Sequence, residues 1–201
     1  MGRRPKHSKA EFQNIALAAA QAIIAEEGLQ SLNVRAVAAR MGCSVGTIYN
    51  FFAGIEELVA LVNAETLDAL HDKLSQAPVT GRPEHDLHVL LDLYLQFVGE
   101  RECSWILLFE ERLPEAKEPP DWYFEKIARL FTLLARILEP LFRPDQEAEL
   151  ARAVRLIWIS LHGVWSLNAR GHLSIVTVDP LATIAHSMVD TYLAGLRAGT
   201  G

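Results

Sequence analysis

The chain has few of the features that cross-link a protein or anchor it in a membrane. Only two of its 201 residues are cysteines, Cys43 and Cys103, and they lack CxxC spacing. No secretory signal precedes them, so we expect a reducing compartment and no obligatory disulfide. The most apolar run, from Val154 to Leu167, is too short to span a bilayer and contains an arginine. These absences predict a soluble, cytoplasmic protein with no membrane partner.

The fingerprints of common enzymes are also missing. The sequence contains no GxSxG nucleophile elbow, no Walker loop and no dinucleotide-binding glycine pattern. One cluster keeps an enzyme open as the second possibility, because HDLH, from His85 to His88, places two imidazoles near Asp92 on one helix face. Without a further ligand, a solvated helix start explains this cluster better than a metal site. We therefore predict a protein that is not an enzyme and holds no metal or cofactor.

Positive charge is scarce overall, but it is unevenly distributed. The formal net charge is −6, which by itself argues against a nucleic-acid partner. Residues 1–55 nevertheless carry six Lys and Arg against three acidic residues, or +3, whereas the remainder carries −9. A basic end on an acidic body is typical of a protein with a DNA-facing module. A solvated basic terminus would give the same pattern, so charge alone does not decide between the two.

Alternation with period two is missing as well, and the whole chain has helical periodicity. The capping box SKAE, which begins at Ser8, starts a first helix that ends at Gly28. Asn33 and Ser44 are expected to cap two short helices. The β-branched run SIVTV, residues 174–178, has no partner strand and is predicted to be a loop. Longer helices are predicted at about 54–74, 84–101, 103–113, 120–140, 145–170 and 180–197.

The two short helices satisfy the steric demands of a helix-turn-helix. The first needs a small residue where the second crosses it, and Ala38 stands at that position. The turn needs a residue that tolerates a left-handed backbone, and Gly42 follows four residues later. The second helix must bury an apolar residue against the first, and Ile48 follows after six more. These three residues in register predict a helix-turn-helix at about 33–52.

The stretch from Gly28 to Val62, GLQSLNVRAVAARMGCSVGTIYNFFAGIEELVALV, resembles the DNA-binding domain of TetR-family transcriptional regulators. The shared features are the glycine that ends the first helix, the VRAVAARMGCSVGTIY core, the aromatic residue after the second short helix, and EEL at the start of the next helix. The resemblance implies an all-α fold with an N-terminal three-helix helix-turn-helix domain at 8–70. A helical effector-binding and dimerisation domain is then expected at 84–198.

The resemblance also implies a function, that of a ligand-responsive DNA-binding regulator. The expected partners are double-stranded DNA, an unidentified small and largely apolar effector, and a second copy of the chain. Repression, with release from the operator when the effector binds, is the default for such a family. A two-fold dimer places its recognition helices about one DNA turn apart, roughly 34 Å, and predicts a near-palindromic operator. Dimerisation is expected through the last two long helices, where four apolar residues of the final helix recur at four-residue spacing: Ile184, Met188, Tyr192 and Leu196.

The second short helix carries most of the predicted DNA contacts, because its N-terminus brings unpaired amides and the positive end of the helix dipole towards phosphate. Gly46 lacks a side chain, so the backbone there can approach DNA closely. Thr47 offers a hydroxyl and a methyl group to a base, and Asn50 can bind adenine through two hydrogen bonds. The basic arm GRRPK adds backbone or minor-groove contacts. The full set of predicted DNA-binding residues is Lys9, Arg35, Ser44, Val45, Gly46, Thr47, Tyr49 and Asn50.

The family resemblance assigns further roles and reveals two departures. Tyr49 resembles the family's phosphate-binding tyrosine, although a buried position between apolar neighbours stays open, and Arg35 matches a position that reaches a base or phosphate in some members. Phe51 stands where histidine or tyrosine is usual, and Ile55 stands where a lysine commonly touches phosphate. Each lost phosphate contact makes binding less salt-dependent. The alternative is therefore a helical small-molecule-binding protein with weakened or lost DNA binding.

The second domain is rich in large aromatic side chains, which form a core more often than a ligand cavity. A domain that senses a ligand still needs a cavity lined by apolar groups and a few polar ones. His162 and Gly163 interrupt an otherwise apolar helix, and His162 is either hydrogen-bonded within the core or directed into that cavity. Gly163 is expected to mark a close helix crossing, either within the chain or at the dimer interface. The candidate pocket residues are Trp105, Phe109, Trp122, Trp158, His162 and Trp165.

Overall fold

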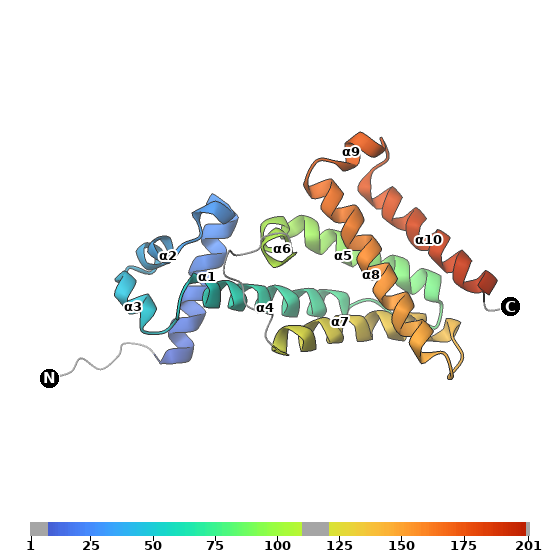
Figure 1. The fold of residues 1–201 in the computed structure, drawn as a ribbon, viewed down its shortest axis with the longest axis horizontal. Helices are drawn as coiled ribbons and strands as arrows, with labels where there is room; N and C mark the ends of the chain where they lie inside the picture. The colour runs from blue at the N-terminus through green and yellow to red at the C-terminus, as the bar shows by residue number, and fades with distance from the viewer. Residues whose placement is uncertain (1–7, 110–120, 200–201) are drawn as a thin grey trace. The chain divides into compact units, whose positions relative to one another are not determined.

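The computed structural model describes residues 8–109 and 121–199, and within these ranges it contains helices and no strand (Figure 1). The all-α fold predicted from the sequence is confirmed. Within the described ranges, no helix combines the length and the apolar character that crossing a bilayer demands. The helices are α1 (Lys9–Glu27), η1 (Leu29–Ser31), α2 (Val34–Met41), α3 (Val45–Tyr49), α4 (Ile55–Leu74), α5 (Pro83–Glu100), α6 (Glu102–Phe109), α7 (Asp121–Leu138), η2 (Glu139–Leu141), α8 (Glu147–Ala169), α9 (Leu173–Val176) and α10 (Leu181–Gly199).

The described residues fall into two compact units. The first comprises residues 8–68 and 101–109, and the second comprises 69–100 and 121–199. Helix α4 contributes to both units, because its residues before 69 belong to the first and the others to the second. The domain limits expected from the sequence, 8–70 and 84–198, stay a prediction.

Short polar residues begin the first three helices where the sequence predicts. Ser8 and Glu11 form a reciprocal capping box, in which the Glu11 amide donates to the Ser8 hydroxyl at 3.2 Å and the Ser8 amide donates to the Glu11 carboxylate at 2.7 Å. The side chains of Asn33 and Ser44 each accept a hydrogen bond from the backbone amide three residues later, at 3.0 and 3.1 Å. These bonds satisfy amides that a helix N-terminus leaves without an internal partner.

The core of the first unit lies where α1 packs against α2 and α6, and where α2 packs against α3. Its buried members come from α1, α2, α3, α4 and α6 and from the turn after α3, and they are branched aliphatic residues, phenylalanines and alanines. This core holds the helix-turn-helix on the long helix α1, so the position of α3 is set by burial rather than by hydrogen bonds alone. Representative members are Phe12, Ala20, Ile24, Ala38, Ile48 and Leu107.

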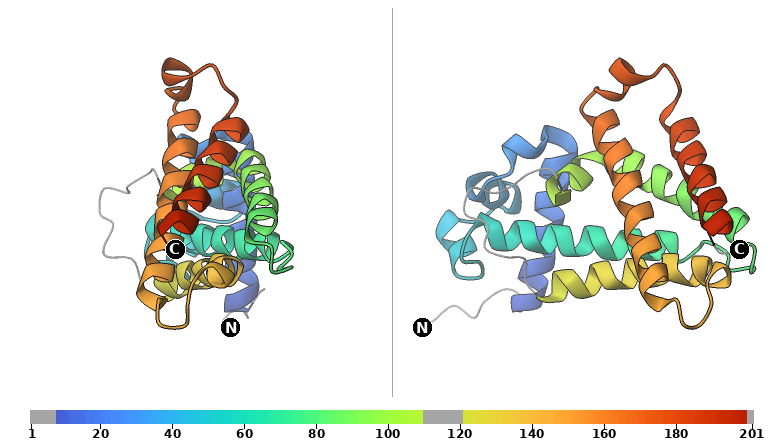
Figure 2. Two further views of the ribbon diagram at one scale, coloured as in Figure 1. Left: turned by 90° about the vertical axis from the view of Figure 1, so that its right-hand side faces the viewer. Right: turned by 45° about the vertical axis from the view of Figure 1, so that its right-hand side comes forward.

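In the second unit, α5 packs against α7 and α10, and α8 packs against α7, α9 and α10. Helices α8 and α10 run beside each other, and the segment that contains α9 joins them at one end (Figure 2). The buried residues recur at helical spacing, as in Leu87, Leu91, Tyr94 and Val98 of α5. Each helix therefore presents one apolar stripe to the interior of this unit.

One sequence expectation is wrong in this unit. Residues 174–178 are not wholly a loop, because Leu173–Val176 forms the one-turn helix α9. The burial of Leu173 and a 3.0 Å hydrogen bond from the Thr177 amide to its carbonyl stabilise this turn without any partner strand. Gly163 marks no close crossing within the described chain, since a Cβ atom built there meets no heavy atom within 4 Å. A close crossing at the dimer interface stays a prediction. The last residues of the helix expected at 103–113 lie outside the described residues.

Candidate nucleic-acid interface

The turn between α2 and α3 has the geometry that the sequence predicts. Gly42 adopts a left-handed conformation, with φ 64° and ψ 33°, which is unstrained only for a residue without Cβ. Ala38 is 2% exposed and Ile48 is 1% exposed, so the small residue and the buried apolar residue meet where the helices cross. The Cys43 amide also donates to the Ala38 carbonyl at 3.0 Å. All three helix-turn-helix residues are therefore confirmed in their predicted structural roles.

Helix α3 buries Ile48, leaves Thr47 half-buried, and is flanked by exposed polar cap residues. Ser44, Gly46 and Asn50 are exposed. Tyr49 is 56% exposed, so the alternative that places its ring in the core is wrong. Its phenolic hydroxyl lies on the same short helix as the exposed polar residues and is accessible to a partner.

The hydroxyl groups of α3 are already arranged with respect to one another. Ser44 Oγ lies 2.9 Å from Thr47 Oγ1, and it also accepts the Thr47 amide. This pairing restricts the rotamers of both side chains at the N-terminal end of α3. The Thr47 methyl and hydroxyl groups are therefore held in one orientation before any partner arrives.

Gly46 has no structural need to be a glycine within the described chain. A Cβ atom built on it meets only the Ser44 hydroxyl, at 3.8 Å, which is an ordinary contact. Its φ is not in the left-handed region that favours glycine. The missing side chain leaves the backbone at the start of α3 uncovered on its exposed side, so another molecule can approach the backbone closely there.

The remaining predicted contacts differ in their surroundings. Lys9 and Arg35 are exposed, and among the described residues neither forms an ion pair, so both charges face solvent. Val45 is half-buried and packs against the core of the first unit, so it supports α3 rather than pointing away from it. The basic arm GRRPK lies outside the described residues.

Arg40 is engaged with helix α1. Its guanidinium contacts the Glu26 carboxylate and lies 3.4 Å from that of Glu27, and both carboxylates are exposed. The hydrogen bond from Arg40, together with its charge, lowers the pKa of the Glu26 carboxyl. The guanidinium therefore joins the end of α2 to the end of α1.

The two departures from the family pattern have a structural explanation. Phe51 stacks on Phe12 of α1, with ring centroids 4.0 Å apart and an interplanar angle of 17°. Ile55, the first residue of α4, is half-buried against the same core. Both apolar side chains therefore add packing to the first unit, and neither offers a cation or hydrogen-bond donor to a phosphate. Cys43 has no reactive character either, because burial raises the pKa of its thiol.

The six candidate pocket residues are distributed between the units. Trp105, which is fully buried, and Phe109 belong to the first unit, with ring centroids 4.6 Å apart. In the second unit, Trp158 lies edge-on to the rings of Tyr94 and Phe131, and Trp165 is 3% exposed. His162 lies next to Trp165, at a ring-centroid distance of 6.2 Å, and Trp122 is half-buried at the start of α7.

Two hollows in the second unit involve other residues, which the sequence reasoning missed as pocket residues. A cavity of about 260 Å³ lies between the end of α4 and helices α5 and α7, with Leu74, Leu90, Leu133, Arg136 and Ile137 among its lining residues. None of the six aromatic and histidine candidates lines it. No motif marks these residues, because they come from three separate helices and from the segment between α4 and α5.

The second hollow is a shallow apolar groove along α10. Every lining residue belongs to this one helix. The four apolar residues predicted at four-residue spacing all line it, so their shared face is confirmed. The groove's lining residues are Ile184, Ser187, Met188, Thr191, Tyr192, Gly195 and Leu196.

The HDLH cluster does not form the metal site that was weighed as an alternative. His88 and Asp92 direct their side chains to residues of α10 rather than to one another. His85 is exposed on the first turns of α5. Across residues 8–109 and 121–199, no three or more His, Cys, Asp or Glu side chains are grouped so that they could hold a metal ion.

A tight helix-turn-helix with an exposed second helix, followed by a helical unit, defines a helix-turn-helix DNA-binding protein as the class. The chain matches the family described as "Bacterial regulatory proteins, tetR family" over residues 16–62. It matches "Tetracyclin repressor-like, C-terminal domain" over residues 87–192, which is more than half of the chain. The chain therefore belongs to the TetR family, and it is a transcriptional regulator and not an enzyme.

Solved structures with the same fold cover almost the whole chain. A protein of unknown function from Rhodococcus sp. RHA1 has a TM-score of 0.72 at 19% identity, covering 97% of this chain and 100% of its own. A TetR-family regulator from Streptomyces coelicolor has a TM-score of 0.67 at 20% identity, covering 93% and 98%. The repressor FadR from Thermus thermophilus, in complex with lauroyl-CoA, has a TM-score of 0.66 at 20% identity, covering 92% of both chains. No curated protein matches the sequence at a significant level.

Proposed function

We propose that this regulator is a homodimeric repressor that reads a near-palindromic operator through α3 and leaves it when a small, largely apolar effector binds. The observation that carries the proposal is the outward side of α3. Exposed Tyr49 and Asn50, the hydroxyl pair of Ser44 and Thr47, and Gly46 lie together on a helix whose position is set by a buried core. A partner with phosphates and base edges suits this set of groups.

In this proposal each exposed group has a separate task. Gly46 allows the start of α3 to approach the DNA backbone, and Tyr49 donates its hydroxyl to a phosphate oxygen. Thr47 and Asn50 contact base edges and give sequence preference. Lys9 and Arg35, whose charges face solvent, supply the salt-dependent part of the affinity. Val45 is removed from the contact set, since it packs inward.

A second copy of the chain completes the proposed regulator. The apolar groove of α10 faces away from α5 and α8, and four of its side chains recur at one-turn spacing. Pairing of this face with its counterpart would bury it and would bring two α3 helices to successive turns of DNA. The proposal places the regulator in the cytoplasm, where bacterial DNA lies.

An acyl chain is the effector chemistry that the similarity to FadR favours. The Thermus thermophilus FadR structure, which is similar over 92% of this chain, is a complex with lauroyl-CoA. The aromatic side chains of the second unit, including Trp158 and Trp165, are compatible with a largely apolar ligand. His162 is the polar candidate within that set.

The effector proposal is tested by anisotropy of a labelled operator fragment bound to the full-length protein. Lauroyl-CoA and lauric acid should each release the DNA, whereas coenzyme A alone should not. A His162→Ala variant should need more lauroyl-CoA for the same release. DNA that stays bound at every concentration of the three probes would exclude an acyl effector and would leave DNA binding itself intact.

The alternative function, a helical small-molecule-binding protein with weakened or lost DNA binding, rests on Phe51 and Ile55. Both pack against the core and supply no phosphate contact. A mobility-shift assay with the DNA that flanks its own gene separates the two functions. Under the alternative, no complex forms even at low salt, while ligand binding persists.

A further inference from the structure

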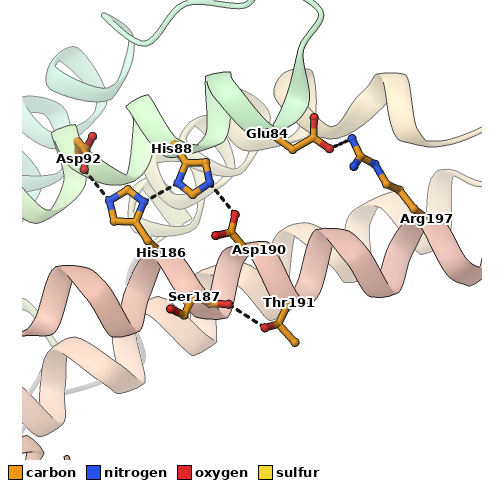
Figure 3. A network of polar contacts seen from close by, with 8 residues as sticks. All are labelled: Glu84, His88, Asp92, His186, Ser187, Asp190, Thr191 and Arg197. Carbon is orange, nitrogen blue, oxygen red and sulfur yellow. Dashed lines mark hydrogen bonds and ion pairs between the residues drawn. The ribbon is translucent and has the colours of Figure 1, made fainter. Parts of the chain in front are cut away.

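Two imidazole rings lie edge to edge between α5 and α10, with their planes nearly parallel (Figure 3). The rings belong to His88 and His186, their centroids are 4.7 Å apart, and their planes differ by 13°. The two Nδ1 atoms are 2.5 Å apart. On the outer side, His88 Nε2 lies 2.7 Å from a carboxylate oxygen of Asp190, and His186 Nε2 lies 2.8 Å from one of Asp92. The four side chains thus form one chain of polar contacts across the helix pair.

This arrangement fixes the number of protons on the pair. An ionised carboxylate only accepts hydrogen bonds, so each Nε2 atom carries a proton and donates it outward. Each Nδ1 atom then faces the other across 2.5 Å. Two lone pairs would repel at that distance, and two N–H groups would collide. One proton between them makes a hydrogen bond, so the pair holds three protons on four nitrogens and one positive charge.

The single positive charge of the pair lies between two carboxylates. Asp92 on α5 and Asp190 on α10 flank it, one at each end. The next polar contact along the same two helices is the ion pair between Glu84 and Arg197. Among the described residues, neither imidazole has a hydrogen bond or an ion pair with a titratable side chain of α7 or α8, the other helices packed here.

We propose that the shared proton is a regulatory ligand of this protein, and that the histidine pair stabilises the packing of α10 on α5 only while that proton is bound. The sequence separation of 98 residues between the two rings makes the contact dependent on the folded state. His88 and His186 are about 28% and 29% exposed at their side chains, so protons from solvent reach them. Histidine is the side chain that ordinarily changes charge between about pH 5 and 8, within the range of cellular conditions.

The sign of the pH dependence follows from counting protons. In the unfolded chain two independent imidazoles carry four protons below about pH 6.5 and two above it. The folded pair carries three. Below about pH 6.5 the unfolded state therefore binds more protons and stability rises with pH, whereas above it the folded state binds more and stability falls with pH. The pair predicts a stability maximum near the ordinary histidine titration point, with losses on both sides.

This maximum distinguishes the shared proton from ordinary ion pairs. Two separate imidazolium–carboxylate pairs would carry four protons, and their contribution would be complete at low pH and would only fall as pH rises. The side of α10 that faces away from the pair carries the apolar groove, with Met188 and Tyr192 among its lining residues. A change in the pairing therefore acts on the helix that bears the proposed dimer face. This effect on dimerisation rests on the proposed function, whereas the proposal of a shared proton is independent of it.

Nitrogen-15 spectra of histidine side chains in the full-length protein test the proton count directly. Near pH 6.5 we expect His88 and His186 to share one strongly downfield proton, and both Nε2 atoms to be protonated. His172, which is exposed, serves as the internal reference. If His88 and His186 titrate independently and in the same way as His172, the proposal is overturned.

Thermal unfolding across pH 5 to 8 gives the second measurement. His88→Phe and His186→Phe keep an aromatic ring and remove the nitrogens, and each should lower Tm near pH 6.5 by about 2–4 °C and flatten the profile. His172→Gln removes an exposed imidazole and should leave the profile unchanged. A wild-type Tm that only falls with rising pH, or Phe variants that keep the wild-type profile, would contradict the shared proton. If a Phe variant does not fold, the wild-type spectra decide the question.

A metal ion is the one occupant other than a proton that could join two Nδ1 atoms. Elemental analysis of the purified protein, with and without chelator, distinguishes a bridging metal ion from a shared proton. We expect no stoichiometric metal, and we expect the histidine spectra to be unchanged by chelation. Stoichiometric zinc or copper whose removal shifts the His88 and His186 signals would overturn the proposal in favour of a metal bridge.

Discussion

The two units of this regulator differ in how far apart in the sequence the residues lie that determine their structure. In the first, a handful of local rules sets the structure: two caps, a left-handed glycine and a buried isoleucine place α3. In the second, α5, α7, α8 and α10 are held by packing and by contacts between residues about 100 positions apart, such as His88 and His186. The comparison teaches that the helix-turn-helix can be located from local sequence, whereas the structure of the second unit depends on contacts between distant parts of the sequence.

Truncation of a buried core residue should give the largest difference between the two units in its effect on DNA binding. Ile48→Ala removes the buried contact of α3 and should cost about 2–5 kcal/mol of stability, with loss of DNA binding. Ile157→Ala in α8, at the same 1% exposure, should cost a similar amount yet leave the α3 surface intact. Denaturant unfolding and operator binding, compared at equal folded fraction, check this. Equal loss of DNA binding in the two variants would contradict the division of roles.

Replacing glycine by alanine should change the stability of the protein in opposite directions in the two units. Gly42→Ala forces a Cβ into the left-handed region and should destabilise the protein by about 1–2 kcal/mol. Gly163→Ala lies within α8, where a Cβ meets no heavy atom within 4 Å, and should stabilise it by roughly 0.5–1 kcal/mol. Chemical denaturation measures both. A destabilising Gly163→Ala would indicate that this face of α8 is closely covered, for example by a partner chain.

Substitution of exposed aromatic residues should show which of them affects DNA binding without affecting stability. Tyr49→Ala should change stability by less than about 0.5 kcal/mol, and it should weaken operator binding roughly 10-fold through the lost phosphate hydrogen bond. Phe124→Ala, at 57% exposure in α7 compared with 56% for Tyr49, is the matched control and should leave the affinity unchanged. Fluorescence anisotropy gives both values. A Tyr49 variant with wild-type affinity would remove this tyrosine from the interface.

The smallest expected effect concerns Ile55. Ile55→Lys would restore the cation that this position commonly carries in the family, at a half-buried site at the start of α4. The slope of log K against log salt should become steeper by about 0.9 for each phosphate neutralised. Titrations at several salt concentrations measure this slope. An unchanged slope would mean that residue 55 lies too distant from DNA to matter.

The sequence was sufficient for those features that depend on neighbours within a few residues. The caps at Ser8, Asn33 and Ser44 and the left-handed turn at Gly42 follow from backbone hydrogen bonding and sterics, which act locally. The four-residue spacing along α10 correctly identified one apolar face, which is half-buried and lines the groove. The core packing of Phe51 was not foreseen, because its partner Phe12 lies on another helix.

Features that depend on tertiary packing could not be read from the sequence. HDLH was weighed as a metal site, whereas His88 bonds to His186 and Asp190, which no local motif connects with it. The cavity beside Leu133 and Arg136 combines residues of different helices that carry no recognisable signature. The one-turn helix α9 was missed because burial of a single leucine, Leu173, outweighs the β-branched composition around it.

Footprinting of the full-length protein on the DNA that flanks its own gene tests the proposed role of α3 most directly. We predict two protected half-sites about one helical turn apart, roughly 34 Å centre to centre. The protection should weaken at higher salt and require a higher protein concentration for Tyr49→Ala. Absence of any sequence-specific protection at low salt, with a folded protein that still binds an acyl ligand, would contradict DNA reading by this helix.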